Sequence, residues 1–321
     1  MNDLKGLCGV LFFCEGGPRV GGGHLSRCAA LAAGFARRGI PCRFRVNREA
    51  PEEFGAPPDT VQRVEDPLDQ SVWPAYPPGT LGVVDSYRVD PGWLEGAERR
   101  LSFLVVDDSR AFPVERHVWG VLNYNLHASV LGYEETGGAR LLGPRYALLR
   151  SSFWDQESFS GQGVLLVAGA ADPLGITPSI LSWWKPSWPR LLAVAGPLWA
   201  AELRSRCHAQ ILGRENLEVV DSPPDLPERM ARAGRVLCTS SVTCYEALAL
   251  RKPLGVFQVA DNQLPIGEAV QAQGLGTNLG PWGTWGPEEL EGWLRSDLPP
   301  PPAVVNPRGA LAAAAELVKV L

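Results

Sequence analysis

The chain has 321 residues, a formal net charge of −5 and a hydrophobic content of 45%. This length predicts roughly two domains, each with a substantial core. The sequence lacks both an apolar stretch of about 18 residues and a signal-peptide pattern, so we expect a cytoplasmic protein without a membrane span. It also lacks a basic stripe with interleaved aromatics, which argues against nucleic-acid binding.

The first predicted unit is a strand over residues 9–14, a glycine-rich loop and a helix. The loop carries Gly21, Gly22 and Gly23 and ends at His24. A helix that begins after a glycine turn presents unpaired N–H groups to an anion. His24 at that helix start could act on the substituent of a bound phosphate, and Arg27 follows one helical turn later. The alternative is a tight turn with a surface histidine and a solvated arginine.

A second strand is expected at 41–46, followed by a proline-rich and poorly periodic stretch over about 49–80. Three further strands are predicted in the first half, at 81–85, 101–107 and 118–123. Asp90 and Pro91 are typical of a helix start.

Polar side chains follow two of these strands. Asp85, Ser86 and Tyr87 offer an acceptor, a hydroxyl and a phenol, or else Asp85 caps a turn and Tyr87 packs. Asp107 and Asp108 could hold a metal or act as acid and base, but loop capping is the better interpretation because no third ligand is evident.

A polar, glycine-containing segment at 150–163 predicts the linker between domains 1–155 and 156–321. The alternation of strands and helices then restarts. Strands are expected at 164–168, 191–195, 217–220, 235–239 and 254–259. Helices are expected from a Thr177 cap, over 243–250, and over 310–321 as the end of the second domain.

The second half has three loops of interest at strand ends. Gly169 opens a small-residue turn that runs to Asp172, and a ligand could approach its backbone closely. The hydroxyls around the start of the 243–250 helix could cradle a diphosphate, and Glu246 could accept hydrogen bonds from a ribose; the residues involved are Ser240, Ser241, Thr243 and Glu246. A capping box from Thr243 to Glu246 is the structural alternative. Asn262 and Gln263 could read sugar hydroxyls or N-acetyl groups, or simply be polar loop residues.

Apolar strands that alternate with helices predict an α/β protein with parallel sheets. We expect two Rossmann-like domains with a cleft between them, and ligands beyond the carboxyl ends of the strands.

Taken in order, the motifs are similar to those of the PseG-type UDP-sugar hydrolases of nonulosonic acid biosynthesis. The resemblance covers most of the chain and rests on residues 22–27, 84–87, 106–108, 122–125, 143–150, 240–243, 246–248 and 262–263. Residues 145–150 and the pair Asn123 and Asn125 are its more specific parts. The Gly169–Asp172 turn departs from the usual Gly-Gly-Ser/Thr-Asp, and residues from about 280 onward have no aligned counterpart.

The resemblance implies a GT-B architecture, related to glycosyltransferases such as MurG. It implies hydrolysis of UDP-2,4-diacetamido-2,4,6-trideoxy-β-L-altropyranose in the pseudaminic acid pathway, without metal or cofactor. The catalytic residues would be His24, as general base on water, and Tyr87, near the sugar.

The substrate-binding residues expected from the motifs and the resemblance together are Gly22, Gly23, Arg27, Asp85, Gly169, Ser240, Ser241, Thr243, Glu246, Asn262 and Gln263. The partner is a UDP-sugar, and other enzymes of the same sugar pathway could associate. Two alternatives stay open: a GT-B glycosyltransferase that uses an acceptor other than water, and a nucleotide-sugar binding protein without turnover.

Overall fold

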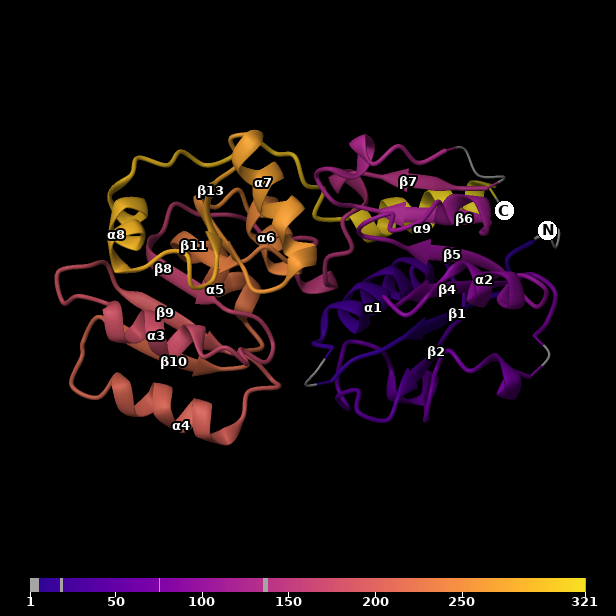
Figure 1. Cartoon of the computed structure of the whole chain (residues 1–321), viewed down its shortest axis with the longest axis horizontal. Coiled ribbons are helices and arrows are strands. Elements are labelled where there is room, and N and C mark those ends of the chain that lie inside the picture. Colours follow the sequence, from indigo (N-terminus) through magenta and orange to yellow (C-terminus); the bar gives the residue numbers. More distant parts are fainter. Residues whose placement is uncertain (1–5, 18–19, 75, 135–137, 321) are drawn as a thin grey trace. The chain divides into compact units, whose positions relative to one another are not determined.

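The computed structural model describes residues 6–17, 20–74, 76–134 and 138–320 (Figure 1). The chain divides into two compact units. The first unit comprises residues Met1–Ser151 and Arg308–Leu321, and the second comprises Ser152–Pro307.

The first unit is built on a parallel sheet of seven strands in the order β3-β2-β1-β4-β5-β6-β7. The strands are β1 (Gly9–Cys14), β2 (Cys42–Asn47), β3 (Val61–Val64), β4 (Thr80–Asp85), β5 (Ser102–Val106), β6 (Gly120–Asn123) and β7 (Arg140–Leu142). The central strands are almost wholly buried, as expected when helices cover both faces of a parallel sheet. The order reverses between β1 and β4, whose ends are in register with Cys14 beside Asp85.

Helix α1 (Gly23–Ala36) follows β1, and the short α2 (Pro91–Ala97) follows β4. The side chain of Asp90 accepts a hydrogen bond from the Trp93 backbone N–H, so the predicted helix start is confirmed. Leu25, Cys28, Leu31, Ala32 and Phe35 recur at helical spacing and are all buried, so they form the apolar face of α1.

The terminal helix α9 (Gly309–Val320) belongs to the first unit, so its expected place in the second domain is wrong. It packs on α1 because small residues line the contact: a Cβ on Gly34 would lie 2.5 Å from the Ala310 carbonyl oxygen. Ala313 and Ala314 are fully buried. The chain therefore returns to its first unit after the second is complete.

The second unit has a six-stranded parallel sheet in the order β10-β9-β8-β11-β12-β13. Its strands are β8 (Gln162–Val167), β9 (Leu191–Ala195), β10 (Leu217–Asp221), β11 (Ala233–Thr239), β12 (Leu254–Gln258) and β13 (Thr277–Pro281). Its helices are α3 (Ile176–Trp183), α4 (Ala201–Gln210), α5 (Leu226–Arg232), α6 (Val242–Ala249), α7 (Leu264–Ala272) and α8 (Pro287–Arg295). The strand order again reverses beside the first strand of the unit, here between β8 and β11.

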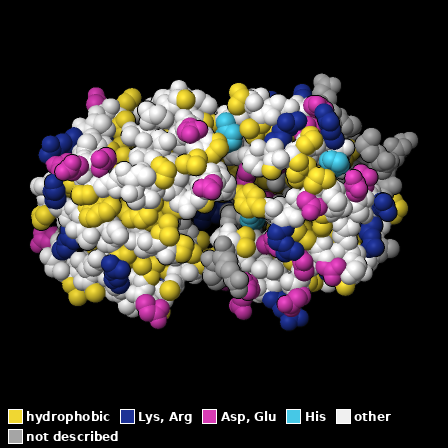
Figure 2. Space-filling view, viewed as in Figure 1, with side chains coloured by type: hydrophobic (Ala, Val, Ile, Leu, Met, Phe, Trp, Pro, Cys, Tyr) yellow, Lys and Arg dark blue, Asp and Glu magenta, His cyan; other side chains and the backbone are white. Residues whose placement is uncertain are grey.

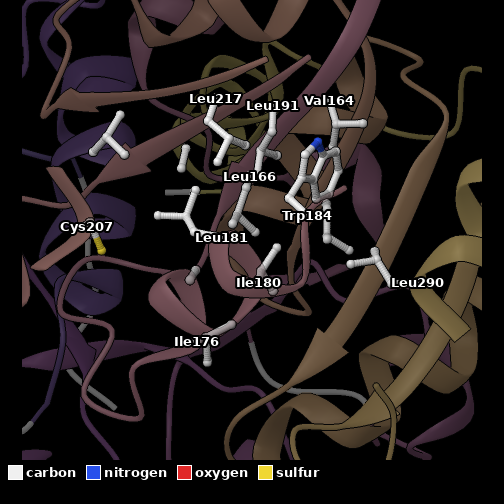
Figure 3. Packing of buried hydrophobic residues seen from close by; sticks show 14 of the residues in the cluster. Val164, Leu166, Ile176, Ile180, Leu181, Trp184, Leu191, Cys207, Leu217 and Leu290 are labelled. Atoms are coloured by element: carbon white, nitrogen blue, oxygen red, sulfur yellow. The ribbon is translucent and has the colours of Figure 1, made fainter. Parts of the chain in front are cut away.

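One core of this unit packs residues of α3 and α8 onto the sheet, and it includes Trp184 and Leu290 (Figure 3). The core is rich in tryptophan. Trp184 is almost fully buried, and its indole N–H donates to the Pro189 carbonyl at 2.8 Å. Trp293 packs where Gly255 leaves room, since a Cβ there would lie 2.7 Å from the indole. Seven of the 11 tryptophans of the chain belong to this core or pack against it, so they have a structural role there.

Within the described residues, none of the helices is both long enough and apolar enough to cross a membrane. All seven cysteines are free thiols, and five of them are buried.

Candidate functional site

The first candidate site lies where β1 and β4 end, at the point where the strand order of the first unit reverses. A ligand is expected at such a switch point in an open parallel sheet. Asp85 is the last residue of β4, and α1 begins just beyond β1 with Gly22 as its N-cap and Gly23 as its first residue. No side chain caps this helix start, which leaves its N–H groups available.

Three residues form a buried hydrogen-bonded cluster at this place. Nδ1 of His24 lies 2.5 Å from Oδ1 of Asp85. Arg27 donates from Nε to Oδ2 of Asp85 at 2.9 Å and from Nη2 to Oδ1 at 2.7 Å. His24 is only 4% exposed and Asp85 only 1%, so the surface-histidine alternative is wrong. Arg27 is likewise buried and paired, not solvated.

The contacts of His24 determine which ring nitrogen carries the proton. Nδ1 faces the carboxylate of Asp85 and also lies 3.1 Å from Nη2 of Arg27, which is a donor only. Nδ1–H therefore donates to Asp85, while Arg27 donates to the same carboxylate. Nε2 has no hydrogen-bond partner among the described residues. In the neutral ring its lone pair is available to accept a proton.

Asp108, beyond the end of β5, completes this cluster. Both of its carboxylate oxygens accept from Nη1 of Arg27, at 2.9 and 2.8 Å. The Tyr87 hydroxyl donates to Oδ2 at 2.7 Å, and Asn125 Nδ2 donates to Oδ1 at 3.1 Å. Burial alone would raise the pKa of Asp108, but the charge and hydrogen bonds of Arg27, with the Tyr87 hydroxyl, lower it to about 2.

Tyr87 connects the cluster with solvent. Its side chain is 60% exposed, and its ring meets the His24 ring edge-on with centroids 4.8 Å apart. The interpretation of Tyr87 as a packing residue therefore does not describe its position. Its phenol stands beside the imidazole that the sequence singled out.

Asp107 belongs to a neighbouring network. Its carboxylate accepts from the backbone N–H groups of Ser109 and Arg110, as the capping interpretation predicted. It also accepts from the Tyr133 hydroxyl at 2.5 Å, and that hydroxyl accepts from Asn123 Nδ2. Among the described residues there is no group of three or more metal-ligating side chains, here or elsewhere.

The second candidate site lies at the carboxyl ends of β8, β11 and β12, which are neighbours in the sheet. Gly169, just past β8, has a φ of +101° and open space where a Cβ would stand. Ser241 is the N-cap of α6, and its hydroxyl lies 2.9 Å from that of Thr239. Ser241 and Thr243 are half-buried, whereas Glu246 is buried one turn into the helix.

The start of α6 is not the capping box that the sequence suggested. Thr243 lies inside the helix, and the Ser241 side chain makes no capping hydrogen bond. Ser240 is fully buried, and its hydroxyl accepts from Nε2 of Gln258 at 2.8 Å. The N–H groups at this helix start, with Ser241 and Thr243, are the groups placed to meet an anion.

The start of α3 is different, because a carboxylate already fills it. Oδ1 and Oδ2 of Asp172 accept from the backbone N–H groups of Ile176 and Thr177, at 2.8 and 2.9 Å. The predicted Thr177 cap is wrong, because Thr177 lies within the helix and Gly175 precedes it as N-cap. Of these two helix starts at the sheet edge, only that of α6 is open to a ligand anion.

Asn262 and Gln263 lie in the 3-10 turn Asp261–Gln263, which follows β12. Asn262 is exposed, while Oε1 of Gln263 accepts from the Val259 backbone N–H at 3.0 Å. Gln263 therefore also shapes the loop.

The contacts of three residues at these sites were not predicted from the sequence. The loop-capping role expected for Asp108 is wrong, because its carboxylate bonds to Arg27, Tyr87 and Asn125. Asp108 pairs with Arg27 across 81 positions, Asp172 caps α3, and Gln258 holds Ser240. Charge complementarity could have suggested the pair of Arg27 and Asp108, but only the strand order brings these two residues together. On the face shown in Figure 2, basic and acidic side chains are interspersed over both units rather than gathered in one stripe.

Scans against family models and against curated proteins both gave no match. Solved structures do match over nearly the whole chain. MurG from Acinetobacter baumannii is 12% identical, with 97% of this chain and 98% of that one covered and a TM-score of 0.60. MnaA from S. aureus, solved with UDP, is 12% identical, with 96% of this chain and 94% of that one covered and a TM-score of 0.62. Arabidopsis thaliana UGT89C1, in complex with UDP-L-rhamnose, is 13% identical, with 95% of this chain and 93% of that one covered and a TM-score of 0.61. The chain therefore has the GT-B fold, with two parallel-sheet α/β domains.

Proposed function

We propose that this protein hydrolyses a UDP-linked sugar at C1, releasing the free sugar and UDP. The observation that carries the proposal is the buried pair of His24 and Asp85, with Nε2 of the imidazole unpartnered, at the switch point of a GT-B sheet. Similar structures were solved with UDP or a UDP-sugar bound, which favours such a ligand here.

His24 acts as the general base in this proposal. Nδ1–H donates to Asp85, which fixes the ring and stabilises the imidazolium that forms. Nε2 accepts a proton from water while the water oxygen attacks C1. The bond from C1 to the phosphate oxygen breaks, and its electron pair leaves with UDP. Attack from the face opposite the leaving group inverts the configuration at C1.

The nucleotide is assigned to the second unit. The start of α6 offers backbone N–H groups and the hydroxyls of Ser241 and Thr243 to the diphosphate, where the helix dipole favours negative charge. Gly169 allows the ligand to approach the backbone at the end of β8. Charge that develops on the leaving diphosphate would be stabilised by these fixed dipoles.

Glu246 is proposed to accept hydrogen bonds from the ribose, and Asn262 and Gln263 to contact the substrate. Tyr87 is proposed to contact the sugar. The resemblance described above supports a diacetamido-trideoxy sugar and the pseudaminic acid pathway. Ser240, being buried and bonded to Gln258, is proposed to hold the α6 loop in shape rather than to touch the phosphate through its side chain.

A glycosyltransferase is the second candidate, because CalG4, a calicheamicin glycosyltransferase, is among the similar structures at 15% identity and a TM-score of 0.56. The same base could remove a proton from an acceptor hydroxyl instead of from water. The two functions differ only in what attacks C1.

The test is NMR of the purified protein with a panel of UDP-N-acetyl sugars, including the 2,4-diacetamido-2,4,6-trideoxy-β-L-altrose derivative, without metal or acceptor. Release of free sugar and UDP supports the hydrolase. Trace release in water that an added acceptor stimulates supports the transferase. Saturable UDP binding without release under any condition contradicts both and favours a binding protein.

A further inference from the structure

The buried cluster around His24 carries more negative than positive charge. Arg27 supplies one positive charge, while Asp85 and Asp108 supply two negative charges. Burial opposes the charge on Arg27, but Asp108 and Asp85 outweigh that effect and raise its pKa. With neutral His24 the four side chains therefore sum to −1, and with protonated His24 they sum to zero.

The other titratable groups that contact His24 or Arg27 do not change this sum. Asp107 interacts electrostatically with Asp108, but its own hydrogen bonds are to Tyr133 and to backbone N–H groups of the neighbouring network. Tyr87 faces His24 from the loop after β4, and Tyr124 faces Arg27 from the segment after β6. Cys28 follows Arg27 on α1 and interacts with Cys14 on β1. Burial raises the pKa of Tyr124 and of Cys28, so both stay neutral at physiological pH. Asn125, which also contacts Asp108, has no charge.

We propose that Asp108 is a positioning residue whose negative charge enables His24 to take up a proton. The inference rests on the proposed function, in which His24 is the base. Asp108 does not touch the imidazole; it acts through Arg27, which lies between the two carboxylates and donates to both.

The physical reason is the position of the Arg27 charge. Nη2 of Arg27 lies 3.1 Å from Nδ1 of His24, so the guanidinium repels an imidazolium. Asp85 alone would have to offset both cations. A second carboxylate on the far side of Arg27 offsets that charge, which leaves Asp85 to stabilise the protonated ring. A buried site with an uncompensated charge favours the ionisation that neutralises it.

The test is an NMR titration of His24 in the ligand-free full-length chain, with labelled histidine. The chain has only four histidines, so a His24→Gln variant assigns the signal. Asp108→Asn keeps the side-chain shape and removes one negative charge. We expect it to lower the midpoint of His24 by about one pH unit, the size typical of a nearby charge in a protein interior. Arg27→Gln removes the positive charge and should raise the midpoint.

Asp107→Asn is the matched control, because it is the same change at the adjacent carboxylate. Asp107 bonds to Tyr133 and to backbone groups, not to Arg27 or His24. Its effect should be less than half that of Asp108→Asn. If Arg27→Gln does not fold, the midpoints of His24 in Asp108→Asn and Asp107→Asn are compared, and that comparison alone tests the inference.

Opposite shifts in the Asp108 and Arg27 variants support the inference, because general loosening of the site would move both midpoints in the same direction. An unchanged midpoint in folded Asp108→Asn protein overturns it. The titration needs no substrate, so a protein that shows these shifts but releases no UDP would overturn the proposed function and leave the charge balance intact.

Discussion

The two units present the same topological feature with opposite chemistry. In each sheet the strand order reverses beside the first strand of the unit, and a helix with an uncapped start follows a strand at that edge. The first unit fills this place with buried ionised groups around His24. The second fills it with glycine, hydroxyls and backbone N–H groups. The difference agrees with the proposed division of roles, with proton transfer in the first unit and recognition of an anion in the second.

Loss of the base should have the largest effect. His24→Ala removes the proposed general base, and general bases typically contribute about 10²–10⁴-fold to rate. We expect turnover to fall by that range while the affinity for UDP, measured by calorimetry, stays unchanged. Equal turnover in the variant and the parent would contradict the division of roles.

Changes at the start of α6 should instead weaken the binding of UDP. The double variant Ser241→Ala, Thr243→Val removes both half-buried hydroxyls at the start of α6. A hydrogen bond to a charged group contributes about 1.5–3 kcal/mol, so UDP affinity should fall at least roughly tenfold. The NMR titration of His24 should be unaffected. Undiminished UDP affinity would show that the diphosphate lies elsewhere.

The charged cluster should make the first unit sensitive to acid. The pKa of Asp108 is lowered to about 2 in the folded chain, against about 3.9 for an unperturbed aspartate. A lowered pKa stabilises the fold above the unfolded value, and this stabilisation of about 2–3 kcal/mol is lost as the pH falls from about 4 to 2. Urea unfolding should show the Asp108→Asn penalty at pH 7 and its disappearance near pH 2. A penalty that persists at low pH would point to packing instead.

Removal of the Asp172 cap at the start of α3 should have the smallest effect. Asp172→Ala leaves the N–H groups of Ile176 and Thr177 without their acceptor, and we expect a loss of about 1–2 kcal/mol in the stability of the second unit. Thermal unfolding measures it. Asp225→Ala is the control, since Asp225 precedes α5 without a side-chain capping bond, and should cost less. Equal losses in the two variants would argue against the role of Asp172 as the cap.

The central strands and three residues of the first buried cluster could be predicted because their signals are local. Continuous apolar runs identify β1, β4, β8 and β12, and the glycine-rich loop identifies the start of α1. His24, Arg27 and Asp85 followed from the rule that functional side chains gather at strand ends.

The features that sequence reasoning missed depend on distant parts of the chain. The edge strands β3 and β7 are only four and three residues long, too short for a periodic pattern. The alanine-rich α9 is compatible with either unit, and only its fit against Gly34 assigns it to the first. Asp108 was seen as one of a local pair with Asp107, whereas its partner is Arg27.

The central claim is that water, activated by His24, attacks C1 of the sugar. Hydrolysis of the UDP-sugar in ¹⁸O-labelled water, followed by mass spectrometry of UDP and by rapid NMR of the first-formed anomer, tests it most directly. The account predicts unlabelled UDP and a sugar whose first-formed anomer is inverted. Label in the diphosphate would mean attack at phosphorus, and retained configuration would mean a covalent intermediate; either result would contradict the account.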